Sequence, residues 1–167
     1  MIITLAGNNA FKIQTGGLTI VTEGPDSGAS RAKPDILLRT AHGKADLPEA
    51  GFSVDGPGEY EIQGVEIQGI PPFTYVMKAE DLRLALISEA NVKILDKLNR
   101  IDIVFIAHAE GAASFIRQIE PRMVIAPQGI AQAIAKELGA EAETMDKVTV
   151  KKKDIPSSGL KCICLAA

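Results

Sequence analysis

The chain has 167 residues, of which 46% are hydrophobic and 23% charged, with a net charge of −3. This length fits a single compact domain over residues 1–167, and the composition excludes a disordered chain. Because there is no basic surplus to neutralise phosphates and no apolar run of the roughly 18 residues that span a bilayer, we expect neither nucleic acid nor a membrane as partner.

The first half of the chain is predicted to form short strands. Residues rich in Ile, Leu, Val and Thr, separated by glycines and prolines, predict strands at 2–5, 10–14, 18–22 and 36–39. Thr15-Gly16-Gly17 is short enough for a hairpin between the second and third strands. Residues 23–32 and 42–51 are polar and glycine- or proline-marked, which indicates surface loops, where functional residues gather.

A second group of strands follows, and helices then begin to alternate with strands. Four strands are predicted as a meander, with Glu80-Asp81 as one turn: 60–63, 65–69, 74–78 and 82–87. Helical spacing and helix stops predict helices at 90–99, 111–119 and 130–138. The remaining strands are predicted at 103–106, 123–126, 148–151 and 160–165. Because the apolar strand 103–106 needs cover on both faces, the chain is predicted to be a layered α/β protein.

Several smaller features set expectations about chemistry and location. Cys162 and Cys164 lie two apart in an apolar strand, which favours two buried thiols over a disulfide. The run Lys151-Lys152-Lys153 is interpreted as solvated strand surface. The N-terminus lacks a basic segment followed by a signal-like apolar core, so we expect a cytoplasmic protein. Strand edges of this kind often pair between subunits, so a homodimer is expected.

The segment GPGEYEIQG is interpreted as architectural. Gly56-Pro57-Gly58 fixes a sharp turn, and Gly64 allows a bulge or tight turn before the next strand. Tyr60 and Ile62 point to one face of the strand between them, and Glu59 and Glu61 point outward into solvent.

Four segments together resemble small proteins of the metallo-beta-lactamase superfamily, usually described as predicted metal-dependent hydrolases. They span residues 1–25, 35–46, 54–71 and 101–129, and VDGPGEYEIQGVEIQGIP is the most specific of them. The resemblance implies a four-layer αββα sandwich. It also implies a metal cleft at one edge, where the two sheets meet.

The segments that carry metal ligands in that family differ here. The first strand ends there in a Gly-His-Ser-like turn, and this chain has Gly7-Asn8-Asn9; the third ends in Asp-Pro, and this chain has Glu23-Gly24-Pro25. The HxHxDH motif falls on residues 40–47. In one register His42 and Asp46 match a ligand histidine and the aspartate, while Lys44 and Leu47 replace two histidines. In the other register, which is set by strand length, Ala41, Gly43, Ala45 and Asp46 fill the four positions, and none of them is the type of residue that the motif has there. A lysine ammonium has no lone pair for a metal.

Two further segments continue this pattern. Where the family has a Gly-Asp-x-Gly-His-like turn, residues 88–91 read Ser-Glu-Ala-Asn, so Glu89 is the only candidate oxygen ligand there. Where the last ligand histidine stands, this chain has Pro127-Gln128-Gly129. His108 follows a buried strand near the expected cleft, so it is a candidate acid, base or ligand, or a structural histidine.

Two functional hypotheses follow, and whether the chain is an enzyme stays open between them. The leading one is a binding or interaction module of this fold that is not catalytic and holds no metal or other cofactor. The alternative is a metal-dependent hydrolase with a reduced mononuclear site for zinc or another divalent metal, built from His42, Asp46 and either Glu89 or His108.

Overall fold

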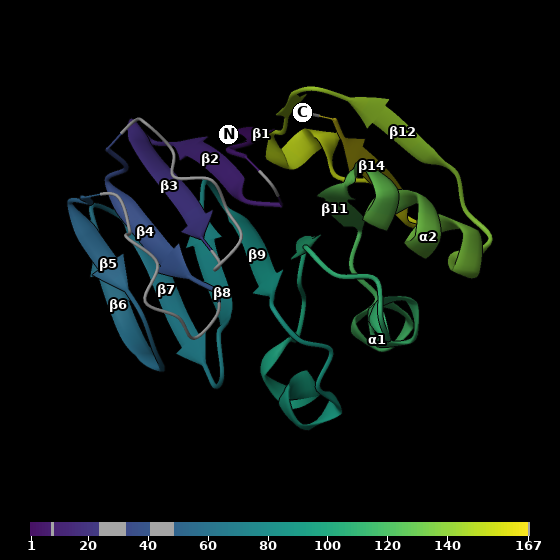
Figure 1. The fold of residues 1–167 in the computed structure, drawn as a ribbon, viewed down its shortest axis with the longest axis horizontal. Helices are drawn as coiled ribbons and strands as arrows, with labels where there is room; N and C mark the ends of the chain where they lie inside the picture. The colour runs from purple at the N-terminus through teal and green to yellow at the C-terminus, as the bar shows by residue number, and fades with distance from the viewer. Residues whose placement is uncertain (8, 24–32, 41–48, 167) are drawn as a thin grey trace.

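Two β-sheets face each other in the computed structural model, which describes residues 1–7, 9–23, 33–40 and 49–166 (Figure 1). The six-stranded sheet has the order β13-β1-β2-β3-β4-β5, and the eight-stranded sheet has the order β12-β14-β11-β10-β9-β8-β7-β6. The six strands are β1 (Ile2–Leu5), β2 (Phe11–Thr15), β3 (Leu18–Glu23), β4 (Ile36–Arg39), β5 (Phe52–Val54) and β13 (Val148–Thr149). The eight are β6 (Gly58–Ile62), β7 (Val65–Ile70), β8 (Thr74–Ala79), β9 (Leu82–Ile87), β10 (Ile103–Ile106), β11 (Met123–Pro127), β12 (Ala142–Met145) and β14 (Lys161–Leu165).

Both sheets are mixed, and their antiparallel parts form the predicted hairpins. Strands β1, β2 and β3 pair antiparallel, and Gly16 and Gly17 form the turn between the last two with φ of 55° and 84°. Strands β6 to β9 form the predicted meander, with Glu80 and Asp81 in its last turn. Strands β9, β10, β11 and β14 then run parallel. Because parallel strands end at the same edge, the residues that follow β9, β10 and β11 are brought together.

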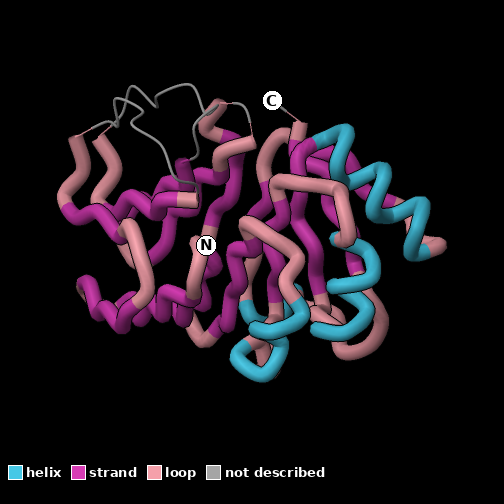
Figure 2. Tube along the Cα trace, turned by 60° about the horizontal axis from the view of Figure 1, so that its bottom comes forward, coloured by secondary structure: helices cyan, strands magenta, loops and turns pink. Residues whose placement is uncertain are grey.

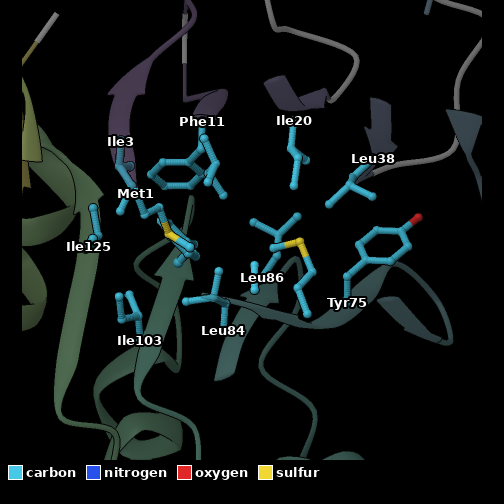
Figure 3. Packing of buried hydrophobic residues seen from close by; sticks show 14 of the residues in the cluster. Met1, Ile3, Phe11, Ile20, Leu38, Tyr75, Leu84, Leu86, Ile103 and Ile125 are labelled. Atoms are coloured by element: carbon cyan, nitrogen blue, oxygen red, sulfur yellow. The ribbon is translucent and has the colours of Figure 1, made fainter. Parts of the chain in front are cut away.

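The main hydrophobic core lies between the two sheets (Figure 3). Alternate residues of each strand point into it, as the burial pattern of β2 shows, with Phe11, Ile13 and Thr15 buried and the residues between them not. Phe11 of the six-stranded sheet meets Phe105 of the other at 5.2 Å between ring centroids, in an edge-to-face arrangement. The Tyr75 side chain is fully buried, and its hydroxyl donates to the backbone oxygen of Val54 across the sheets.

A second core lies between the eight-stranded sheet and the helices. Figure 2 shows these helices gathered beside that sheet. It is covered by α1 (Ala112–Ile119), α2 (Gln128–Leu138) and the 3₁₀ helix η1 (Val92–Lys97). The predicted α/β sandwich is confirmed, since two sheets face each other and helices cover the eight-stranded one. A helix layer over the six-stranded sheet, the fourth layer of that prediction, is not found among the described residues. Within those residues, no helix is both long and apolar enough to cross a membrane.

Most predicted elements agree with the structure to within two residues at each end, and four features were missed or assigned wrongly. Strand β5 is only three residues long, too short for a visible alternation, and β12 carries largely exposed polar residues. The segment predicted as a helix at 90–99 forms only η1, whose start is capped by the Asn91 side chain.

The predicted strand at 148–151 is shorter, and the lysine run is not strand surface. Lys152–Asp154 forms a short 3₁₀ helix, η2, because the Asp154 carboxylate accepts a hydrogen bond from the Lys151 N–H. Lys152 Nζ also pairs with the Asp102 carboxylate at 2.9 Å.

The N-terminal ammonium ties the two sheets together at one side of the sandwich. The Met1 side chain is buried, and its ammonium donates to Glu80 Oε2 at 2.8 Å, while the Thr15 hydroxyl donates to Glu80 Oε1 at 2.7 Å. These bonds, with that from the ammonium contributing most, hold the pKa of Glu80 below its usual value of 4.5. The carboxylate therefore joins β1 and β2 to the turn between β8 and β9.

Replacing Glu80 with glutamine is expected to lower the free energy of unfolding at neutral pH by about 1 kcal/mol, since the carboxylate is partly exposed. Because the folded pKa lies below the unfolded one, this stabilisation is complete above pH 4.5 and is lost as the pH falls through the folded pKa. Urea unfolding of the unmodified protein and of Glu80→Gln, at neutral and at acidic pH, measures the difference in their free energies of unfolding. This difference should be smaller at acidic pH. Glu66→Gln, which removes an exposed pair with Lys78, is the control and should change little.

Candidate functional site

A small cavity of about 110 Å³ lies at the edge where β9 and β10 end and the two sheets meet. Its walls come from both sheets, from the turn after β1 and from the residues that follow β4, β9 and β10. The described residues that line it are Asn9, Phe11, Thr22, Thr40, Leu86, Ile87, Ser88, Ala107 and His108. Their polar groups are amide, hydroxyl and imidazole groups, and the other lining side chains are apolar.

The position of each polar group follows from the strand that precedes it. In the parallel pair, Ile87 of β9 lies beside Ile106 of β10, so Ser88 and Ala107 leave the sheet side by side and His108 comes next. Thr22 is near the end of β3, where its side-chain oxygen accepts a hydrogen bond from the Phe11 N–H at 2.8 Å. Asn9 adopts a φ of 59° in the turn between β1 and β2, a conformation that asparagine tolerates better than most residues.

Two buried polar atoms at this cavity have no hydrogen-bond partner in the described part of the chain. They are Ser88 Oγ and His108 Nε2. A buried polar atom left without a partner costs about 1–3 kcal/mol, so such atoms in folded proteins are nearly always satisfied by protein, water or a ligand. Both belong to residues that line the same small cavity.

His108 is held in its neutral form by its surroundings. Burial lowers the pKa of His108 below its usual value of 6.5, and the carboxylates of Glu89 and Glu110 raise it by less. A neutral imidazole has one nitrogen that donates a hydrogen bond and one that accepts. The ring can therefore accept a hydrogen bond or a metal ion at neutral pH.

A second, larger hollow of about 370 Å³ adjoins the same edge and shares Asn9 with the first. It lies beside the start of α2, where Pro127 caps the helix without a side-chain hydrogen bond. Pro127, Gln128 and Gly129, the segment where the resemblance predicts the last ligand histidine, all line it. Those residues therefore lie at the rim of the expected cleft and present backbone and an amide to it.

The candidate residues named from sequence fall in three different places. His108 lines the cavity, whereas the Glu89 side chain is exposed and Glu89 is not among the lining residues, although it follows Ser88 directly. His42 and Asp46 lie outside the described residues. Ser88, Thr22 and Thr40 were not singled out from sequence. For Ser88 the available signal was its place directly after a buried strand that runs parallel to the one before His108.

The described residues do not fit the ligand set of a zinc centre. Nowhere among them do three or more His, Cys, Asp or Glu side chains gather closely enough to hold a metal ion. At the cavity they offer one imidazole alongside amides and hydroxyls, whereas zinc sites use several imidazole, thiolate or carboxylate ligands. Cys162 and Cys164 are free and buried in β14, as predicted, and burial raises the pKa of the Cys162 thiol.

Comparison with known proteins identifies the fold through structure alone. No family model and no curated protein sequence matches this chain. A proposed Zn-dependent hydrolase of the metallo-beta-lactamase superfamily from Thermotoga maritima superposes with a TM-score of 0.76 at 16% identity, covering 99% of this chain and 100% of the other. A proposed metal-dependent hydrolase from Parabacteroides distasonis gives 0.59 at 15% identity, covering 84% and 90%. At these identities the likeness is one of fold.

Proposed function

We propose that this chain, which has the metallo-beta-lactamase fold, is a binding module that works without a catalytic metal and receives its ligand at the strand-end cavity. The observation that carries the proposal is the chemistry of the cavity wall: the described residues there supply neutral hydrogen-bonding groups and a single imidazole. Such groups can recognise a polar ligand but cannot by themselves supply the Lewis acid and activated water of metal-dependent hydrolysis.

The sequence supports the same proposal at positions far apart in the chain. Asn8 stands where the resemblance places a histidine, residues 88–91 offer one carboxylate, and Pro127-Gln128-Gly129 stands where it places the last histidine. A di-metal site of the usual kind needs several imidazoles, and the whole chain has 2 histidines. A cytoplasmic location and self-association into a homodimer are part of this proposal.

The alternative function is a hydrolase with one metal ion held by His42, Asp46 and either Glu89 or His108. One observation favours it: burial lowers the pKa of His108, which favours the neutral imidazole that binds metals, and its buried Nε2 has no partner among the described residues. The two similar structures are also described as proposed metal-dependent hydrolases. Glu89 would have to turn inward to join such a site, because its side chain is exposed.

Metal analysis of protein purified without chelator distinguishes the two functions. We expect far less than one zinc, iron or manganese ion per chain, and no rise in the melting temperature when zinc is added to the apoprotein. His42→Ala and Asp46→Asn should then leave metal content and stability unchanged. Near-stoichiometric metal that is lost in His42→Ala, together with hydrolysis of a model ester, would establish the alternative.

A further inference from the structure

The pair of unpartnered atoms at the strand-end cavity identifies the kind of ligand it takes. We propose that this cavity binds a small uncharged group of the carboxamide or urea type, held between Ser88 Oγ and His108 Nε2. This rests on the proposed function, since it assigns the ligand class of the same site. A carboxamide carries a donor nitrogen and an acceptor oxygen on the same carbon, and a serine hydroxyl and a neutral imidazole can each complement one of them.

The size of the cavity limits the ligand to a small molecule or the end of a larger one. A volume of about 110 Å³ holds about three or four water-sized groups at roughly 30 Å³ each. Acetamide and urea each have about this many non-hydrogen atoms. Phe11, Leu86 and Ile87 form the buried apolar part of the wall, where a methyl or methylene group would pack. Asn9 is exposed and His108 half-buried, so the cavity opens to solvent on their side.

The electrostatic surroundings disfavour a charged ligand of either sign. The described residues of the wall offer no carboxylate to pair with a cationic ligand. They also offer no ammonium or guanidinium group to pair with an anionic one. A neutral hydrogen-bonding group avoids both costs.

The two histidines of the chain give a direct measurement. In full-length protein labelled with ¹⁵N-histidine, only two imidazoles contribute signals, and His42→Gln assigns them. The metal-free protein is titrated with acetamide, acetate and methylammonium, which have similar size and differ in charge. We expect acetamide to shift the His108 signals saturably, with a dissociation constant on the order of millimolar for so small a ligand. Acetate and methylammonium should not produce a saturable shift.

Ser88→Ala tests whether the ligand spans both atoms. Loss of one hydrogen bond should weaken acetamide binding by about threefold to tenfold. Ser114→Ala, at an exposed position of α1, is the matched control and should bind like the unmodified protein. Because Ser88 Oγ has no hydrogen-bond partner in the described part of the chain, Ser88→Ala should keep its melting temperature, which separates weaker binding from misfolding.

Three results would overturn the ligand assignment: no saturable shift with acetamide, equal affinity for acetate or methylammonium, or undiminished affinity in Ser88→Ala. The first would mean that the cavity holds water alone. Metal content, measured separately, decides the proposed function. A metal-free chain that ignores acetamide rejects only the ligand class, and a stoichiometric metal ion rejects the metal-free module.

Discussion

Truncation of Phe105 to alanine is expected to lower the free energy of unfolding by about 3–5 kcal/mol, the range for large aromatic residues removed from a well-packed core. Phe105 lies in β10, is fully buried, and meets the Phe11 ring at 5.2 Å. Its strand has neighbours on both sides, β9 and β11, so the backbone cannot move in to fill the space. The substitution therefore leaves a cavity between the two sheets.

Phe52→Ala is the matched control, because the same atoms are removed from a residue with 42% of its surface exposed. Urea unfolding of both variants should show a several-fold larger loss for Phe105→Ala. Since Phe11 also lines the strand-end cavity, Phe105→Ala should in addition weaken acetamide binding at His108. Equal destabilisation of the two variants would contradict the placement of Phe105 at the centre of the core.

Replacing Gly69 with alanine is expected to destabilise the protein by about 3 kcal/mol, at the upper end for overpacking. An added methyl group at Gly69 would overlap the backbone oxygen of Gly56 and lie 3.1 Å from Pro57 Cα. Both atoms belong to the turn that leads into β6, and β6 pairs with β7 through Gly58 and Gly69. The turn would have to move away from the sheet, because a backbone atom cannot rotate aside as a side chain can.

Gly56→Ala provides the control within the same turn, since a methyl group there meets no atom within 4 Å. Thermal unfolding should show a large fall in melting temperature for Gly69→Ala and a small change for Gly56→Ala. Two similar melting temperatures would contradict the close approach of the turn to β7. The experiment also tests the architectural interpretation of the GPGEYEIQG segment.

Much of the fold was predictable because its signals are local. The hairpin turns at Gly16-Gly17 and Glu80-Asp81 and the ends of α1 and α2 depend on residues a few positions apart. The elements that were not predicted depend on contacts between distant residues rather than on a pattern in the nearby sequence. Strand β5 is held by pairing with β4, and η2 is stabilised by Asp154 and by Asp102, 50 residues from Lys152.

Only some of the residues that line the strand-end cavity could be predicted from the sequence. The place of His108 after a buried strand could be predicted from the chain, because the apolar run before it is a local pattern. Ser88 and Thr22 could not be chosen over the many other serines and threonines, because hydroxyl residues carry no characteristic spacing. The structure selects them because their strands end at the same cavity.

By itself, the sequence determined the order and type of most elements, the layered α/β class and the strand-end position of His108, because side-chain periodicity and turn chemistry act between near neighbours. Only the tertiary structure decided that Ser88 and His108 share one cavity with Asn9, Thr22 and Thr40, and that Glu80 holds the Met1 ammonium. These contacts join distant segments through strand register, and a shift of one residue in register turns every side chain of a strand to the opposite face.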